Sequence, residues 1–227
     1  MGEMTTAEAS ERLGVSQRQI QRLIRVGEVP ARRTAGDAWV LDALAVNALA
    51  RSRPSRGRPW SPEAAWGALW MLSGLRATWV GARAESRAWS RLGALEPAAL
   101  VHACRRRAHV RRCRVSDSFL DDLRGALVPS GASAAEQFGL SGETAQVEGY
   151  CDGATWAAIL SKLRLAADPR GNATIRVTTV SEVLGVGLSA MPVAVVAADL
   201  AQSREARERS AGLAALADLQ NELGLTE

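Results

Sequence analysis

Apolar residues near the start of the chain recur at the three- and four-residue spacing of short helices that bury one face. Thr5 or Thr6 can cap the first of these helices, and Gly14 can end it, because glycine adopts the left-handed backbone of a tight turn. Ser16 can then cap a second helix. The pattern therefore predicts two helices joined by a tight turn, with buried positions Ala9, Leu13, Ile20, Leu23 and Ile24.

A short hairpin is predicted after the second helix. Pro30 opens it, Gly36 and Asp37 can form its turn, and residues 39–41 return as a strand. Asp42 then caps a third helix that extends through Leu49. Residues 1–51 are therefore expected to form one small domain.

The outer side of the second helix carries amide and guanidinium groups, which can reach base edges and phosphates. Arg32 and Arg33 lie on the outgoing arm of the hairpin, the position of a wing that touches the DNA backbone or minor groove. These features predict a winged helix-turn-helix. Its expected DNA-binding residues are Ser16, Gln17, Arg18, Gln21, Arg22, Arg25, Arg32 and Arg33.

The run "TTAEASERLGVSQRQIQRLIRVGEVPARR", continued by "GDAWVLD", resembles the excisionase and MerR-type winged helix-turn-helix. The resemblance covers about the first 50 residues and implies that this part of the chain binds double-stranded DNA. The long coiled-coil dimerisation helix of MerR regulators does not follow the wing, so their effector-driven mechanism is not carried over to this chain.

The middle of the chain is predicted to be helical and basic. Residues 52–60 combine arginine, proline, glycine and serine without an acidic residue, as expected of a basic linker. In the segment 61–115, Ser61 can cap a helix. Trp66 and Trp70 are expected to anchor its core rather than to stack on bases.

A dense arginine cluster closes this middle segment. Two interpretations remain open: a second phosphate-binding patch, or the solvated face of a helix and a strand. No metal site is expected, because the nearby His102, Cys104, His109 and Cys113 lack Cys-x-x-Cys spacing and the arginines would oppose a cation. The cluster consists of Arg105, Arg106, Arg107, Arg111, Arg112 and Arg114.

Residues 116–227 are predicted to form an α+β domain with a small sheet. The segments "AQVEGYC" and "NATIRVTTV" alternate as strands do, and 168–172 forms a turn before the second of them. Helical stretches are expected near 117–127, 132–138, 155–163, 192–202 and 205–223. The fold class of the whole chain is therefore α+β and mainly helical.

This last part is similar to the C-terminal region of AbiEi-type antitoxins of toxin–antitoxin systems. The similarity lies in "LVPSGASAAEQFGL", in the turn at Gly171 and Asn172 that leads into a strand, and in the apolar run that ends in Asp199. It implies an autorepressor whose second domain opposes a nucleotidyltransferase-like toxin.

Charge divides unevenly along the chain. Residues 1–128 hold 21 arginines and 12 acidic residues, whereas residues 129–227 hold 7 basic and 12 acidic residues. Basic charge in the first half favours a polyanionic partner there. Three cysteines form no disulfide framework, and the chain shows neither a secretory signal nor an apolar run long enough for a membrane span. We expect a cytoplasmic protein.

The sequence offers little catalytic chemistry. It lacks a Gly-x-Ser-x-Gly motif, a phosphate-binding loop and a His-Glu-x-x-His motif. Glu143, Glu148 and Asp152 are expected to belong to a solvated strand face rather than to a catalytic pair. We therefore expect neither an enzyme nor a cofactor.

The sequence favours a DNA-binding transcriptional repressor, the autoregulating antitoxin of a toxin–antitoxin pair, that binds its own promoter and a cognate toxin. Two alternatives remain open. One is an interaction protein that masks a partner enzyme and binds DNA weakly. The other is an excisionase-like factor that bends DNA.

Overall fold

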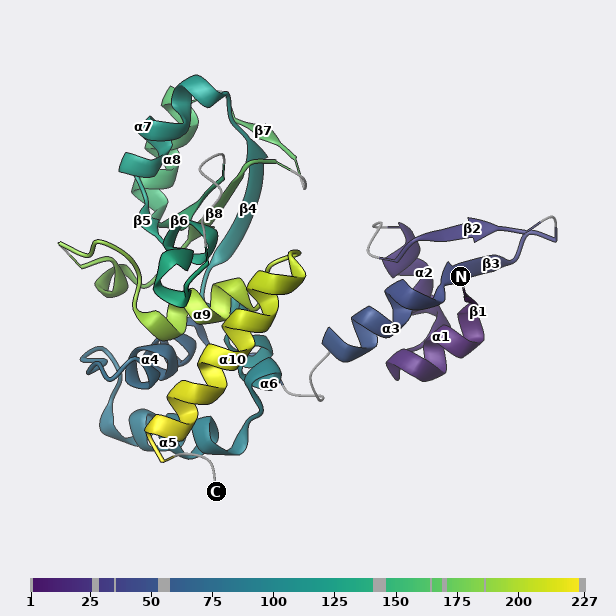
Figure 1. The fold of residues 1–227 in the computed structure, drawn as a ribbon, viewed down its shortest axis with the longest axis horizontal. Helices are drawn as coiled ribbons and strands as arrows, with labels where there is room; N and C mark the ends of the chain where they lie inside the picture. Colours follow the sequence, from purple (N-terminus) through teal and green to yellow (C-terminus); the bar gives the residue numbers. More distant parts are fainter. Residues whose placement is uncertain are drawn as a thin grey trace. The chain divides into compact units, whose positions relative to one another are not determined.

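The chain folds into two compact units, Met1–Arg56 and Gly57–Glu227 (Figure 1). The computed structural model describes residues 2–25, 29–34, 36–52, 58–140, 146–163, 165–168, 171–185 and 187–224. Helices dominate and each unit contains one small sheet, so the predicted α+β, mainly helical class is confirmed.

The boundary between the units falls inside the predicted linker 52–60, of which residues 53–57 lie outside the described part of the chain. The segments 61–115 and 116–227, which differ in composition, belong to one unit. A strand of the first segment pairs within the sheet of the second, which joins the two.

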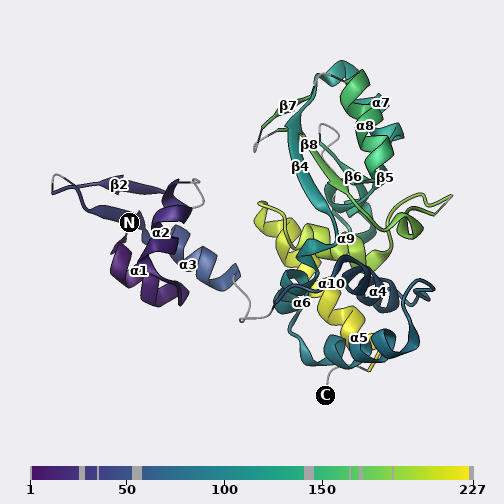
Figure 2. The same ribbon diagram turned by 180° about the vertical axis from the view of Figure 1, so that it is seen from behind.

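The first unit packs three helices against an antiparallel sheet. Its sheet has the order β1-β3-β2, and the β2–β3 hairpin extends to one side of the helices (Figures 1 and 2). The buried core includes Ala9, Ile20, Leu23, Leu41 and Val46. The elements are β1 (Glu3–Thr5), α1 (Thr6–Leu13), α2 (Gln17–Arg25), β2 (Ala31–Arg33), β3 (Trp39–Asp42) and α3 (Ala43–Ser52).

Strand β1 is absent from the sequence prediction. The strand has only three residues and ends at the N-cap Thr5, so it is too short to show the alternation that indicates a strand. Glu3 pairs with Asp42 in the register of β3, and Met4 packs against the core of the unit. The strand therefore forms through tertiary pairing.

The second unit contains a mixed sheet and a layer of helices. Its sheet has the order β5-β6-β8-β4-β7, in which β6 and β8 are parallel and the other neighbours are antiparallel. Its elements are α4 (Pro62–Leu72), α5 (Ala82–Ala94), α6 (Pro97–Ala103), η1 (Cys104–Arg106), β4 (His109–Arg114), η2 (Asp117–Phe119), α7 (Leu120–Gly125), β5 (Val128–Pro129), η3 (Gly131–Phe138), β6 (Val147–Cys151), α8 (Gly153–Lys162), β7 (Ala166–Ala167), β8 (Ala173–Val177), η4 (Ser181–Leu184), α9 (Val193–Leu200) and α10 (Ala206–Glu222).

The two faces of this sheet differ in chemistry because successive side chains of a strand alternate between them. Helices α7 and α8 cover one face (Figures 1 and 2), which contributes Cys113, Val147, Cys151, Ala173 and Ile175 to an apolar core. The strand register places Arg112, Glu148, Tyr150, Thr174 and Arg176 together on the opposite face. That face is polar.

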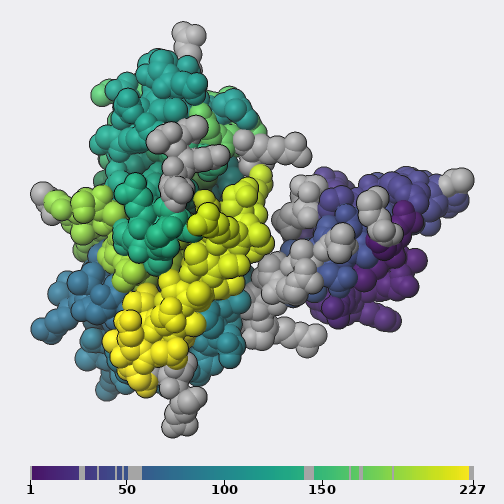
Figure 3. All heavy atoms as spheres, viewed as in Figure 1, coloured from purple at the N-terminus to yellow at the C-terminus, as the bar shows by residue number. Residues whose placement is uncertain are grey.

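Helix α9 lies at the centre of the second unit and is buried from Ala194 to Leu200. Helix α10 packs along it and forms part of the surface (Figure 3). The two backbones come close at Gly212, where an added Cβ atom would lie 2.4 Å from the carbonyl oxygen of Ala197. A larger residue at this position would separate the helices. Within the described chain, no helix is long and apolar enough to cross a membrane.

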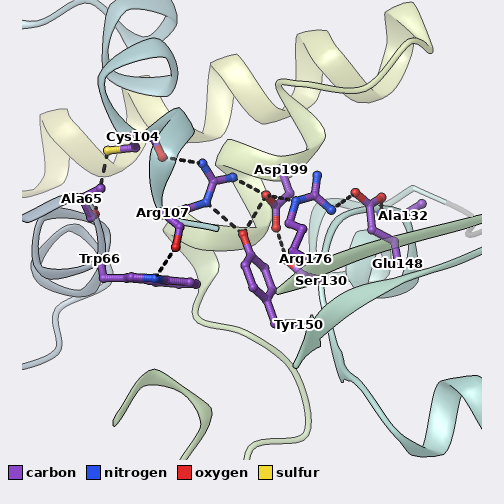
Figure 4. Close-up of polar contacts among 10 residues, drawn as sticks. All are labelled: Ala65, Trp66, Cys104, Arg107, Ser130, Ala132, Glu148, Tyr150, Arg176 and Asp199. Atoms are coloured by element: carbon purple, nitrogen blue, oxygen red, sulfur yellow. Dashed lines mark hydrogen bonds and ion pairs between the residues drawn. The ribbon is translucent and has the colours of Figure 1, made fainter. Parts of the chain in front are cut away.

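Asp199, on α9, is fully surrounded by polar partners from the rest of the second unit (Figure 4). Arg107 and the hydroxyl of Tyr150 donate hydrogen bonds to its Oδ1 atom, and Ser130 donates to Oδ2. Nε of Arg176 lies 2.9 Å from Oδ1 in a second ion pair. Asp199 therefore joins α9 to four segments that are distant in the sequence.

This cluster balances its own charge. Arg176 also pairs with Glu148, so two guanidinium groups meet two carboxylates. Burial alone would lower the pKa of Arg107, but Tyr150 and Asp199 outweigh it and raise that pKa above its usual value. Burial raises the pKa of Tyr150, which keeps its hydroxyl protonated as a donor. We call Arg107, Ser130, Glu148, Tyr150, Arg176 and Asp199 the buried polar cluster.

We expect Asp199→Asn to destabilise the second unit by about 3–5 kcal/mol, because it leaves two buried guanidinium groups with one carboxylate. Urea unfolding followed by tryptophan fluorescence measures this, since six of the seven tryptophans lie in the second unit. Asp121→Asn is the control. It removes an exposed ion pair with Arg124 and should cost about 0–1 kcal/mol. An equal loss of unfolding free energy in the two variants would show that the buried polar cluster does not stabilise the second unit more than an exposed ion pair does.

Candidate nucleic-acid interface

Local hydrogen bonds hold the start of α1 and the turn between α1 and α2. Thr5 and Glu8 form a reciprocal capping box at the start of α1, which lowers the pKa of the Glu8 carboxyl through the hydrogen bonds from Thr5. Gly14 ends α1 at φ 61°, a conformation that favours glycine. Ser10 then donates a 2.6 Å hydrogen bond to the carbonyl oxygen of Val15. The turn is therefore held by residues adjacent in sequence.

Helix α2 presents one apolar and one polar side. Ile20 and Leu23 are buried in the core of the unit, as predicted. The opposite side is exposed, contains no acidic residue and carries the predicted recognition residues Gln17, Arg18, Gln21, Arg22 and Arg25. Ser16, at the start of the helix, is exposed as well and accepts a 3.4 Å hydrogen bond from the backbone N–H of Gln19. These groups are free to meet base edges and phosphates.

The two predicted wing arginines are exposed on β2, but each has a carboxylate partner within the unit. Arg32 donates to Glu3 through Nε at 3.1 Å and Nη2 at 2.8 Å. Arg33 pairs with Asp37, and its guanidinium carbon lies 4.9 Å from the ring centroid of Trp39. Contact with phosphates therefore requires the arginines to exchange these partners or to share them.

Comparison with known proteins agrees with this geometry. Residues 3–54 match the family model of a helix-turn-helix domain. The match covers the first unit, which is therefore a helix-turn-helix domain of a DNA-binding protein. No curated protein and no solved structure matches the chain.

The arginine cluster of the second unit does not form one surface. Arg107 is buried in the polar cluster, so its assignment to a phosphate-binding or solvated face is wrong. Its guanidinium group donates hydrogen bonds to Tyr150 and Asp199 instead. Arg111 points to the opposite side of β4 from Arg112 and Arg114, because strand residues alternate. The remaining members, Arg105 and Arg106, are exposed on η1.

Besides Arg107, two further arginines of the cluster contact described partners. Arg114 pairs with Asp168, with 2.9 Å between Nε and Oδ2, and Arg105 contacts His102. The nearby thiols lie apart, because Cys104 belongs to the helical core and Cys113 to the core beneath the sheet. Among the described residues, no group of three or more potential ligands could hold a metal ion.

The carboxylates considered for catalysis have separate environments. Glu148 pairs with buried Arg176 and accepts a 3.0 Å hydrogen bond from the N–H of Ala132, so its expected solvated position is wrong. Asp152 caps α8 through the N–H of Thr155, which lowers its pKa. Glu143 lies outside the described residues.

The buried polar cluster as a unit was not predicted from the sequence. Its clearest signal was Asp199, the one ionisable residue in the otherwise apolar helix from Val193 to Leu200. A single acid in such a helix indicates a buried partner of opposite charge.

We expect Glu3→Gln to raise DNA affinity about two- to fivefold, the range set by the strength of an exposed ion pair, because it releases Arg32 for a phosphate. Fluorescence anisotropy with a labelled duplex measures the affinity. Glu11→Gln is the matched control, since it removes the same charge from an exposed position on α1. An equal gain in both variants would show that net charge, and not release of Arg32, causes the effect.

Proposed function

We propose that the protein is a sequence-specific transcriptional repressor that binds its own promoter. The observation that carries this proposal is the solvent side of α2, where amide and guanidinium groups lie together without an acidic residue. Glutamine and arginine side chains can form paired hydrogen bonds with adenine and guanine edges in the major groove. We assign base reading to Gln17, Arg18, Gln21 and Arg22, and phosphate contacts to Arg25, Arg32 and Arg33.

We expect the double variant Arg18→Ala/Arg22→Ala to lose selective binding in a gel-shift assay on the upstream DNA of the gene against a scrambled duplex. Each base-reading arginine should contribute about 1–3 kcal/mol of the specific affinity. Measurements at two salt concentrations separate this loss from phosphate attraction, because phosphate contacts set the salt dependence.

Arg83→Ala/Arg87→Ala is the matched control. These arginines are exposed at the same four-residue spacing on α5 of the second unit, so the variant changes the net charge equally. It should bind the upstream DNA as the unaltered protein does. Weak binding to both duplexes by the unaltered protein would instead favour an interaction protein that masks a partner, and a sharp bend in bound DNA would favour an excisionase-like factor.

We further propose that the second unit makes this repressor the antitoxin of a nucleotidyltransferase-like toxin, in the cytoplasm and without a catalytic step of its own. The support is the similarity of "LVPSGASAAEQFGL" and of the run that ends in Asp199 to AbiEi-type antitoxins. The structure adds that Ser130 and Asp199, one from each of these stretches, bind one another in the buried polar cluster.

We expect co-expression of the protein to restore growth of cells that express the toxin encoded beside it. Arg18→Ala/Arg22→Ala should restore growth equally well, because the altered residues lie in the first unit. Growth arrest that persists with soluble, folded protein would contradict the antitoxin role and leave the repressor proposal intact.

A further inference from the structure

The second unit contains a polar pocket that none of the functions above uses. It has a volume of about 240 Å³. The polar face of the sheet forms one wall, with Arg112, Thr174, Glu148 and Arg176. The turn between α9 and α10, residues 202–205, forms another. The pocket therefore adjoins the buried polar cluster, since Arg176, Glu148 and Asp199 of that cluster line it.

Charged groups of both signs line this pocket. It has three guanidinium groups, those of Arg112, Arg176 and Arg204, and four carboxylates, those of Glu148, Asp199, Glu205 and Glu208. Arg176 is neutralised by Glu148 and Asp199, whereas the guanidinium groups of Arg112 and Arg204 make no ion pair with any residue in the described part of the chain. These two cationic side chains line one pocket without a direct ion-pair partner among the described residues.

The electrostatics of Arg112 reflect this arrangement. Burial lowers its pKa most, and the charges of Arg204 and Arg176 lower it further, while Glu148 offsets part of the change. The side chain is half-buried, so water screens this repulsion less than it would on an open surface. An anion between Arg112 and Arg204 would relieve the repulsion.

Other groups of the pocket suit an anionic ligand with hydrogen-bonding substituents. Thr174 offers a hydroxyl group beside Arg112, its neighbour in the strand register, and Gln202 offers an amide. The Ser203 hydroxyl donates a 2.5 Å hydrogen bond to Glu208, so this carboxylate of the pocket already has a partner. The volume lies below the roughly 300–1,000 Å³ of pockets for drug-sized ligands, so the ligand must be small.

We propose that this pocket binds a small molecule with a phosphate or carboxylate group, which is held between the guanidinium groups of Arg112 and Arg204. Planar guanidinium groups suit both anions, because each can donate two parallel hydrogen bonds to a pair of oxygen atoms. The ligand is anchored on β4 from one side and on the α9–α10 turn from the other.

Isothermal titration of the full chain with inorganic phosphate and, separately, with malonate tests this site, against chloride at matched ionic strength. We expect saturable binding at one site for at least one of the two anions. Arg112→Gln/Arg204→Gln should weaken it about tenfold or more, since each lost charge-assisted hydrogen bond is worth roughly one such factor. Tighter binding of phosphate would identify a phosphorylated ligand, and tighter binding of malonate a carboxylated one.

Arg87→Gln/Arg207→Gln is the control, because these arginines are exposed on α5 and α10 and do not line the pocket. It should leave the anion affinity unchanged. Without anion, Arg112→Gln/Arg204→Gln should melt at the same temperature as the unaltered protein or higher, since it removes repulsion. Should that variant fail to fold, Arg204→Gln alone, at an exposed turn position, supplies the test. Absence of saturable binding for both anions, or equal weakening in both double variants, would overturn the proposal.

Discussion

The buried carboxylate of Asp199 is the constraint on which the second unit depends. A charge inside a protein is stable only with opposite charge and hydrogen bonds around it, and here these come from the η1 turn, β6, β8 and the residue before η3. The ion pairs and hydrogen bonds of Asp199 therefore link the polar face of the sheet to the position of α9. The same arrangement places Arg176 in the lining of the pocket and leaves Arg112 without an ion-paired carboxylate.

The sequence predicted most elements of the first unit because neighbouring residues determine them. Gly14 and the Thr5 cap act within a few positions of the turn that they shape, and the buried face of α2 follows from helical spacing alone. The exposed side of α2 could be predicted for the same reason. The wing was predicted less completely, since nothing in the sequence pairs Arg32 with Glu3 across 29 positions.

The different environments within the arginine cluster could not be predicted from the sequence. Arg107 is indistinguishable from Arg105 and Arg106 in the sequence, yet its contact with Asp199 spans 92 positions. The structure also changes the charge division of the chain. The second unit unites the basic middle segment with the acidic C-terminal one, and its 19 basic and 18 acidic residues nearly cancel. An acidic partner-binding domain is therefore a property of one segment and not of the folded unit.

The separation between Arg107 and Asp199 also constrains how the chain folds as it is synthesised. The first unit has its buried core once Val46 has emerged, so it can fold early. The second unit cannot neutralise Arg107 and Arg176 until α9 follows, because Asp199 belongs to that helix. More than half of the chain therefore stays partly folded during synthesis until α9 has formed. The helix-turn-helix domain can fold before that point.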